Sequence, residues 1–194
     1  MLFSKEEIRR NLLGGLEIAL FMQKGSKRFG NTYDEAMRSF IIPILLFPFS
    51  LAALYLFPIP EMAGASKNAL TLMFSLRLSF SWLAFFGIIY WMLQRLDHME
   101  HFYRFVIATN WLTVPATVVF IPVAFMLLGG NFSWIQLYPF MKFLVIYSYA
   151  FSAFMAVHVL IVPWELAGFF VFLTMMIDKS TLDFMHWVGT LFSS

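Results

Sequence analysis

Residues 69–93, ALTLMFSLRLSFSWLAFFGIIYWML, form a run of apolar side chains that carries a single charged residue, Arg77. About 20 apolar residues in a helix cross a hydrocarbon core about 30 Å thick, so this run is long enough to span a membrane. Apolar and polar residues do not alternate along it, which favours a helix over a strand of a membrane barrel. The run therefore predicts a transmembrane helix.

The composition of the whole chain supports the same class. Hydrophobic residues make up 61% of the 194 residues and charged residues 12%, with a mean hydropathy of +0.78, whereas about 25% of a soluble domain is charged. The sequence thus predicts an integral membrane protein and excludes an ordinary soluble domain. Because it contains no cysteine, disulfides and thiolate metal ligands are excluded as well.

Four other apolar runs accompany residues 69–93. Three of them are long enough to span, but the last, residues 163–177, is only about 22 Å long at 1.5 Å per residue. It would need a thin bilayer or help from the residues that follow. We therefore predict an all-α integral membrane protein, a five-helix transmembrane bundle over residues 36–178 followed by a short C-terminal tail at 179–194. The predicted spans are residues 36–57, 69–93, 105–128, 139–162 and 163–177.

Residues 1–35 differ from the rest in being basic and amphipathic. Ser4 with Glu7, and Thr32 with Glu35, have the spacing of a capping box, in which the two side chains cap a helix start reciprocally. After Ser4, apolar residues recur at helical spacing and predict an amphipathic helix that lies in the membrane interface or packs on a partner. These positions are Ile8, Leu12, Leu16, Ala19 and Leu20, with Gly14 and Gly15 expected to weaken the middle of the helix.

The distribution of lysine and arginine predicts the orientation. Most of the 13 basic residues lie before the first span or between the second and third spans, and basic loops stay on the cytoplasmic side. The N-terminus is therefore expected in the cytoplasm, five spans place the C-terminus outside, and the bacterial inner membrane is the expected location. The residues assigned to the cytoplasmic side are Lys5, Arg9, Arg10, Lys24, Lys27, Arg28, Arg38, Arg95 and Arg104.

Three stretches carry a resemblance to known proteins: FGNTYDEAMRSF at residues 29–40, HFYRFVIATNWLTV at 101–114 and WELAGFFVFLTMMI at 164–177. In this order, after a basic amphipathic start, the chain resembles small, uncharacterised five-span membrane proteins of alphaproteobacteria, which are distantly similar to the Yip-domain family. The resemblance implies five spans and a cytoplasmic N-terminus. Eukaryotic members of the Yip family interact with Rab GTPases and act in vesicle traffic, but no catalytic motif accompanies the resemblance.

Arg77 and Lys142 are the basic residues expected inside the membrane, where an ionisable side chain is costly and marks a candidate site. Both lie in spans predicted to run inward, so both are expected in the outer half, with no carboxylate at that depth. Three interpretations stay open: snorkelling to the outer headgroups, a site for a phosphate or an anionic lipid, and a transport path. On the cytoplasmic side, Lys24, Lys27 and Arg28 are the expected contacts for anionic headgroups.

Residues 97–101, DHMEH, are a low-ranking candidate for a metal site. Asp97, His98 and His101 offer imidazole and carboxylate ligands of the kind that zinc and iron bind, but their spacing matches no established motif. A solvated interfacial loop that holds no tightly bound metal is therefore expected.

Asn110 and His158 are the polar residues of interest within spans. Asn110 is expected to hydrogen-bond a neighbouring helix. A haem held by two histidines within spans is not expected, because only His158 lies near that depth. No cofactor is therefore predicted.

The sequence favours a function without catalysis. It contains no Gly-rich phosphate loop, no GxSxG motif and no carboxylate pair within a span, so an enzyme is not expected. Its basic N-terminal stretch lies against the membrane, which argues against nucleic acid as a partner. We expect a non-enzymatic, Yip-like scaffold or membrane-organising protein whose partners are lipids and a membrane protein or a second copy. The alternative is a small transporter or channel component with a path near Arg77 and the spans kinked by Pro43, Pro48, Pro115 and Pro122.

Overall fold

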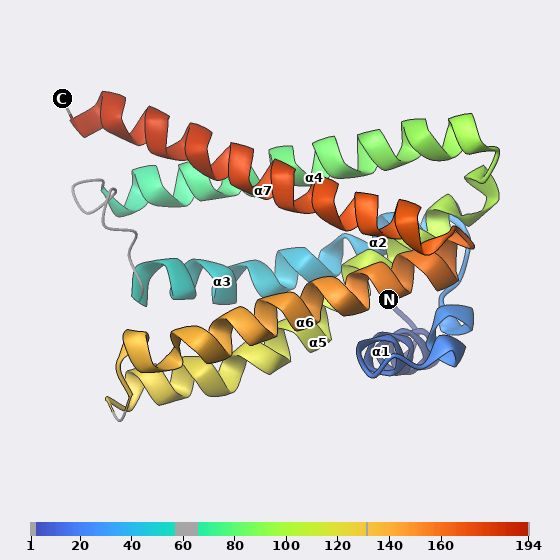
Figure 1. Cartoon of the computed structure of the whole chain (residues 1–194), viewed down its shortest axis with the longest axis horizontal. Helices are drawn as coiled ribbons and strands as arrows, with labels where there is room; N and C mark the ends of the chain where they lie inside the picture. The colour runs from blue at the N-terminus through green and yellow to red at the C-terminus, as the bar shows by residue number, and fades with distance from the viewer. Residues whose placement is uncertain (1–2, 57–65, 131, 194) are drawn as a thin grey trace.

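A computed structural model describes residues 3–56, 66–130 and 132–193. Every regular element in this part of the chain is helical (Figure 1). This confirms the all-α class predicted from the sequence. In chain order the elements are α1 (Lys5–Ala19), η1 (Gln23–Arg28), α2 (Tyr33–Ser39), α3 (Ile41–Leu56), α4 (Lys67–Leu96), η3 (Met99–His101), α5 (Phe102–Leu128), α6 (Trp134–Leu160) and α7 (Trp164–Ser193).

Four helical segments of the described chain are long and apolar enough to cross a membrane. They correspond to the first four predicted spans, and they confirm a multi-pass arrangement of apolar helices. The segments are Tyr33–Ala52, which joins α2 to α3, Lys67–Leu96, Met99–Leu128 and Ile135–Leu160.

The first of these segments is broken between α2 and α3. Pro43 lies in the first turn of α3, where it has no N–H to donate, and in an unbroken helix its ring would clash with the carbonyl of residue 39, the last residue of α2. Only long hydrogen bonds bridge the break, from the N–H of Phe40 to Met37 at 3.4 Å and from the N–H of Ile44 to Phe40 at 3.5 Å. The proline thus separates a short, polar α2 from the apolar α3.

The last helix, α7, is longer than the sequence predicts. It continues without a break through the expected tail at residues 179–194 as far as Ser193, a total of 30 residues or about 45 Å. No proline or glycine interrupts residues 169–188, so the apolar run and the polar residues after it form one helix that packs against α4 (Figure 1). Because Asp178 and Lys179 follow that run, α7 is not among the four segments above, and a fifth span stays a prediction.

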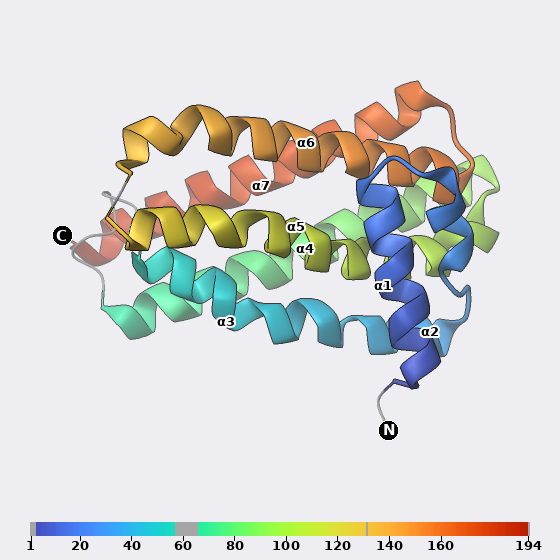
Figure 2. The ribbon, with the colours of Figure 1, turned by 90° about the horizontal axis from the view of Figure 1, so that it is seen from below.

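Helices α3 to α7 run along the long axis of the molecule, and α1 crosses them near one end (Figures 1 and 2). We call this end the α1 end and the opposite one the far end. The main hydrophobic core lies at the α1 end, where Ile18, Ile89, Leu93, Ile107 and Leu160 are completely buried. A much smaller cluster lies toward the far end and consists of Val123, Leu137 and Leu144. The α1 end is therefore the more tightly packed half of the bundle.

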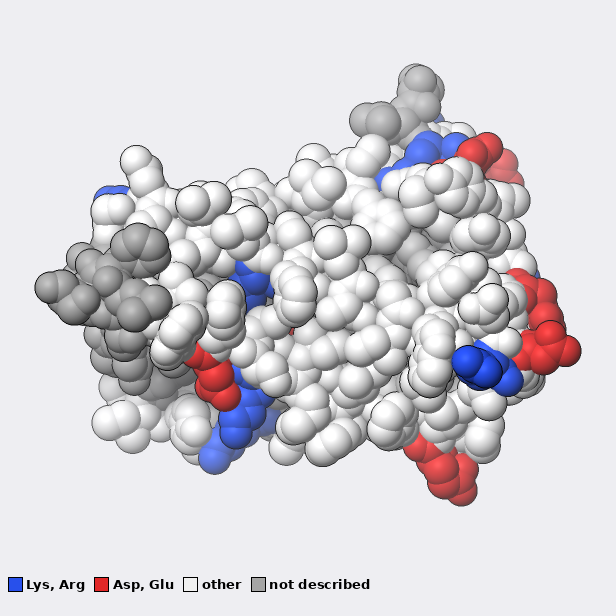
Figure 3. Space-filling model, turned by 90° about the horizontal axis from the view of Figure 1, so that it is seen from above, with Lys and Arg blue, Asp and Glu red and all other residues white. Residues whose placement is uncertain are grey.

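Large apolar side chains remain exposed along the length of the bundle. Leu83 of α4 is 76% exposed, Phe125 of α5 70% and Ile146 of α6 67%. Uncharged side chains cover most of the face in Figure 3, whereas acidic and basic side chains gather at its right-hand end and in a smaller group toward the lower left. An apolar surface of this extent is typical of helices that face lipid rather than water.

Candidate functional site

The N-terminal helices begin with matching sequence patterns. In SKEEIRR, residues 4–10, the hydroxyl of Ser4 accepts a hydrogen bond from the N–H of Glu7 at 3.0 Å. In TYDEAMR, residues 32–38, the hydroxyl of Thr32 accepts one from the N–H of Glu35 at 3.3 Å. The N-caps predicted from the sequence are therefore present. The second half of each capping box is not, because both glutamate side chains reach across to the other helix.

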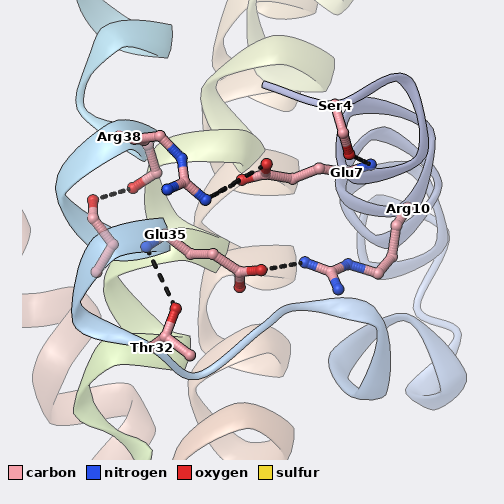
Figure 4. Close-up of polar contacts among 8 residues, drawn as sticks. Ser4, Glu7, Arg10, Thr32, Glu35 and Arg38 are labelled. Atoms are coloured by element: carbon pink, nitrogen blue, oxygen red, sulfur yellow. Dashed lines mark hydrogen bonds and ion pairs between the residues drawn. The ribbon is translucent and has the colours of Figure 1, made fainter. Parts of the chain in front are cut away.

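Two ion pairs join α1 to α2 in reciprocal order (Figure 4). Arg10 donates to the carboxylate of Glu35 at 2.9 Å, and Arg38 donates to the carboxylate of Glu7 at 3.3 Å. Within each helix the glutamate precedes the arginine by three residues, Glu7 before Arg10 and Glu35 before Arg38. When the two helices present these residues in opposite order, each glutamate therefore faces the arginine of the other helix. The repeated pattern S/T-x-x-E-x-x-R is a sequence signal for this contact that the capping interpretation missed.

A third ion-pair set joins α1 to η1. The carboxylate of Glu17 receives two hydrogen bonds from the guanidinium of Arg28, at 2.6 and 2.7 Å, and lies 3.5 Å from the ammonium of Lys24. The hydrogen bonds from Arg28 lower the pKa of Glu17, and the same bonds raise the pKa of Arg28. A bidentate pair of this kind is among the stronger ionic contacts. Arg28, predicted as a lipid contact, is thus engaged within the protein, whereas Lys24 and Lys27 are exposed.

Glycines allow η1 and α5 to approach α1 closely. A Cβ atom on Gly25 would lie 2.7 Å from the carbonyl oxygen of Gly14, and one on Gly14 would lie 2.9 Å from the ring of Phe29. A Cβ on Gly15 would lie 3.4 Å from the carbonyl oxygen of Trp111 on α5. The expectation that Gly14 and Gly15 weaken the helix is therefore incomplete, because both sit where α1 packs most tightly.

The end of α1 is fixed to α6. Phe21 adopts a left-handed conformation with φ of 56°, which is uncommon for a large side chain. Its ring packs edge to face on Tyr147 and Phe154, at centroid distances of 5.7 and 5.5 Å, and the hydroxyl of Tyr147 donates to the carbonyl of Ala19. We use the name N-terminal clamp for α1, η1 and α2 held by these contacts.

The clamp directs the large apolar side chains of α1 away from the bundle. Its inner face consists of small and polar residues together with Ile18, and includes Asn11, Gly14 and Gly15. The outer face has the opposite character, because Ile8, Leu13 and Leu16 of α1 are exposed, as are Leu20 and Met22 just after its end. This inverts the usual arrangement of a helix on a water-soluble protein.

Asn31 connects the N-terminal clamp to the loop between α4 and α5. Its side-chain amide donates to the carbonyl of Glu100 at 2.6 Å, and its side-chain oxygen accepts from the N–H of Arg104 at 3.0 Å. In that loop, ligand atoms of His98, Glu100 and His101 lie within 4.8 Å of one another. Of the three residues predicted as metal candidates, the structure thus brings the two histidines together, with Glu100 in place of Asp97.

Asn110 and His158 make contacts within the bundle. Asn110, which is 2% exposed, donates to the hydroxyl of Ser39 on α2 at 2.8 Å, and this is the interhelical contact expected from the sequence. His158 packs on Phe154 and Trp164, with ring centroids 4.3 and 6.4 Å away. Both residues therefore stabilise helix packing at the α1 end.

Arg77 contacts α7 rather than a lipid surface. Its guanidinium donates to the carbonyl of Asp178 at 3.2 Å, and the next turn of α4 contacts α7 through the hydroxyls of Ser81 and Thr181, 3.1 Å apart. Since α4 runs toward the α1 end and α7 away from it, Asp178 lies closer to the α1 end than Thr181. The Arg77 side chain thus points toward the α1 end, whereas snorkelling to the outer headgroups would direct it toward the far end. The sequence analysis did not consider Asp178 as a neighbour of Arg77, because it ended the last span at residue 177; the contact is made through the backbone carbonyl of Asp178.

Lys142 makes its contact on α6. It is exposed on α6, with its ammonium 4.5 Å from the centre of the Tyr138 ring on the same helix. Arg77 thus contacts α7, and Lys142 contacts its own helix. An anion site shared by the two cations stays a prediction from the sequence.

A cavity of about 850 Å³ opens between α3, α4 and α5 and extends toward the far end. Its walls are mostly apolar, with Pro43, Phe49, Trp82 and Phe120 among the lining residues, and Arg77 does not line it. Two lining threonines, Thr113 and Thr117, donate their hydroxyls to carbonyls of α5 itself. The cavity is therefore better suited to bind a lipid acyl chain than a hydrophilic solute.

The chain matches no family model, no curated protein and no solved structure. Its candidate site is accordingly defined by geometry alone, and the resemblance to Yip-domain proteins stays an expectation from the sequence.

Proposed function

We propose that this protein is a non-enzymatic membrane scaffold in which the N-terminal clamp holds α1 as a fixed surface on the cytoplasmic leaflet. The outward apolar face of α1 carries the proposal: Leu16 is 49% and Leu20 61% exposed, although α1 is anchored to the bundle on its other side. A helix in this arrangement needs a lipid interface or a protein partner to cover its apolar face.

The charges beside α1 favour an anionic lipid surface. Lys24 and Lys27 are exposed on η1, which follows α1, although the ammonium of Lys24 also lies 3.5 Å from Glu17. Each basic group near an anionic leaflet contributes about 1 kcal/mol of attraction. The excess of basic residues at this end supports a cytoplasmic orientation, and with it the bacterial inner membrane as the location. Arg28 is not part of this lipid surface, since Glu17 occupies its guanidinium.

The rigidity of the clamp supports a role in holding a partner. Three ion-pair sets, close glycine contacts and an aromatic cluster hold α1 at one angle to the bundle. Membrane attachment alone does not require this, because the spanning helices already anchor the chain. A surface of fixed shape reduces the entropy lost when a membrane-protein partner or a second copy binds.

Photo-crosslinking from α1 tests the proposal in native membranes. A photoreactive residue at Leu16 is expected to cross-link to anionic lipid and to one defined membrane protein. The same residue at Leu83, which is more exposed but lies on α4, serves as the control and should capture lipid alone. If Leu16 captures neither a defined protein nor a second copy, or captures the same products as Leu83, α1 is not a scaffold surface.

A transporter is the second candidate, favoured by the contact between Arg77 and α7. An ionisable side chain within a bundle that pairs with a backbone carbonyl of another helix is one of the arrangements found on ion paths, and here Arg77 donates to the backbone carbonyl of Asp178. Proteoliposomes that show solute or proton flux abolished by Arg77→Gln would support this function. Flux that is absent, or that is unchanged in the variant, would leave the scaffold as the better account.

A further inference from the structure

The loop between α4 and α5 presents two histidines on one side. Asp97 ends α4 in a left-handed conformation with φ of 59°, and the 3-10 turn Met99–His101 follows. A 3-10 helix has three residues per turn, so side chains three positions apart eclipse each other. The turn therefore aligns His98 with His101, whose ring centroids lie 6.3 Å apart.

Glu100 completes a set of three ligands. Its carboxylate lies 3.5 Å from Nε2 of His101, and one ligand atom from each of His98, Glu100 and His101 lies within 4.8 Å of the other two. Zinc binds imidazole nitrogen and carboxylate oxygen at about 2.0–2.2 Å. Rotations that bring each ligand atom inward by about 1 Å would give this geometry. Nδ1 of His98 is buried and has no hydrogen-bond partner among the described residues, so no protein contact competes for it.

We propose that His98, Glu100 and His101 bind one exchangeable divalent transition-metal ion, of which zinc is the best match, with water completing the coordination shell. Two imidazoles and one carboxylate suit zinc and leave a position open to water. A set of only three protein ligands, with the side chain of Glu100 exposed, favours an ion that exchanges rather than one that is tightly held.

The proposed ion also has a connection to the N-terminal clamp. Asn31 bonds the carbonyl of Glu100 and the N–H of Arg104, on either side of His101. A metal ion that fixes the turn would therefore favour the same loop conformation that Asn31 binds, and would stabilise the start of α2. This property is independent of whether α1 serves as a scaffold surface.

Measuring zinc binding to the tag-free protein in detergent tests this inference. A chromogenic chelator competes for the zinc, and the absorption spectrum of bound Co²⁺ reports the ligand geometry. One equivalent of ion is expected, with an affinity about 10-fold or more lower in His98→Ala and in His101→Ala. Glu100→Gln should weaken binding as well. Asp97→Asn is the matched control, because it changes a carboxylate in the same loop outside the set and suits the left-handed conformation; its affinity should equal that of the unchanged protein.

Binding weaker than millimolar would overturn the proposal, as would equal affinity in the unchanged protein and both histidine variants. Helix content and thermal unfolding without metal are measured for each variant, since a folded variant with lost binding separates ligand loss from misfolding. If His98→Ala does not fold, His101→Ala and the conservative change Glu100→Gln, at a ligand whose side chain is 67% exposed, decide the question.

Discussion

Glu7 of α1 and Arg38 of α2 form an ion pair of 3.3 Å across 31 residues of sequence, and Arg10 and Glu35 repeat it with the charges exchanged. The carboxylate side chains are mostly buried, at 11% exposure for Glu7 and 19% for Glu35. This reciprocal pairing ties α1 to α2, so the orientation of α1 depends on it.

Reversing one charge should loosen α1, and reversing both should restore it. Glu7→Arg places two arginines face to face, and a partly exposed pair of this kind contributes about 0.5–1 kcal/mol. Faster amide hydrogen exchange in α1 is expected in Glu7→Arg, with recovery in the double variant Glu7→Arg, Arg38→Glu. Equal exchange rates in the single and double variants would show that the pairing does not hold α1.

A methyl group at Gly25 should disrupt the contact between η1 and α1. Its Cβ would lie 2.7 Å from the backbone oxygen of Gly14, and backbone cannot move aside as a flexible side chain can. Gly25→Ala is therefore expected to make the N-terminal clamp sensitive to protease, at a cost of about 1–3 kcal/mol. Gly87→Ala is the control, since nothing lies within 4 Å of its added Cβ, and it should resist protease like the unchanged protein.

Acid should release η1 from α1 through Glu17. The hydrogen bonds from Arg28 lower the pKa of Glu17 in the folded protein, so its stabilising contribution is complete above the unfolded pKa of about 4.3. This contribution is lost as the pH falls through the pKa that Glu17 has in the folded protein, which is the lower of the two. Hydrogen exchange of η1 is expected to accelerate in that range, and Glu17→Gln should abolish this pH dependence. The exposed Glu6 provides the control, because Glu6→Gln should leave the dependence intact.

The absence of cysteine allows topology to be mapped with single cysteines. A cysteine at Lys27 should be shielded from an impermeant reagent in right-side-out cells, whereas cysteines at Ser66, Ser133 and position 193 should be labelled. Lys27 is preferable to the neighbouring Ser26, which is buried and donates its hydroxyl to Gln23. Labelling at Ser133 together with shielding at position 193 would show that α7 does not cross the membrane.

The sequence predicted the elements better than their contacts. Apolar runs identify helices that cross a membrane because the bilayer sets their length, and four of the predicted runs coincide with such helices. The length of α7 was missed because hydropathy ends at Ile177, while helical conformation continues through polar residues that pack on α4. For the same reason the contact of Arg77 with Asp178 was not predicted.

In the N-terminal clamp, the capping patterns predicted where α1 and α2 begin, but not the tertiary contacts that their side chains make. Ser4 and Thr32 cap as their spacing indicates, whereas Glu7 and Glu35 bond arginines that are distant in sequence. The same holds for the glycines. Helix propensity predicts that Gly14 weakens α1, but it does not predict which segment packs against Gly14. The spacing of three residues between His98 and His101 allows the two side chains to converge if the loop is helical, but it does not specify the 3-10 turn that brings them together.

The depth of α1 in the membrane tests the central claim most directly. Nitroxide labels at Leu16 and Leu20, measured in nanodiscs that contain anionic lipid, report collisions with oxygen dissolved in lipid and with a nickel chelate dissolved in water. If the N-terminal clamp holds the outer face of α1 in the leaflet, both labels will be accessible to oxygen and protected from the chelate, and a label at the exposed Lys5 will show the reverse. Labels at Leu16 and Leu20 that are as accessible to the chelate as the label at Lys5 would contradict the account.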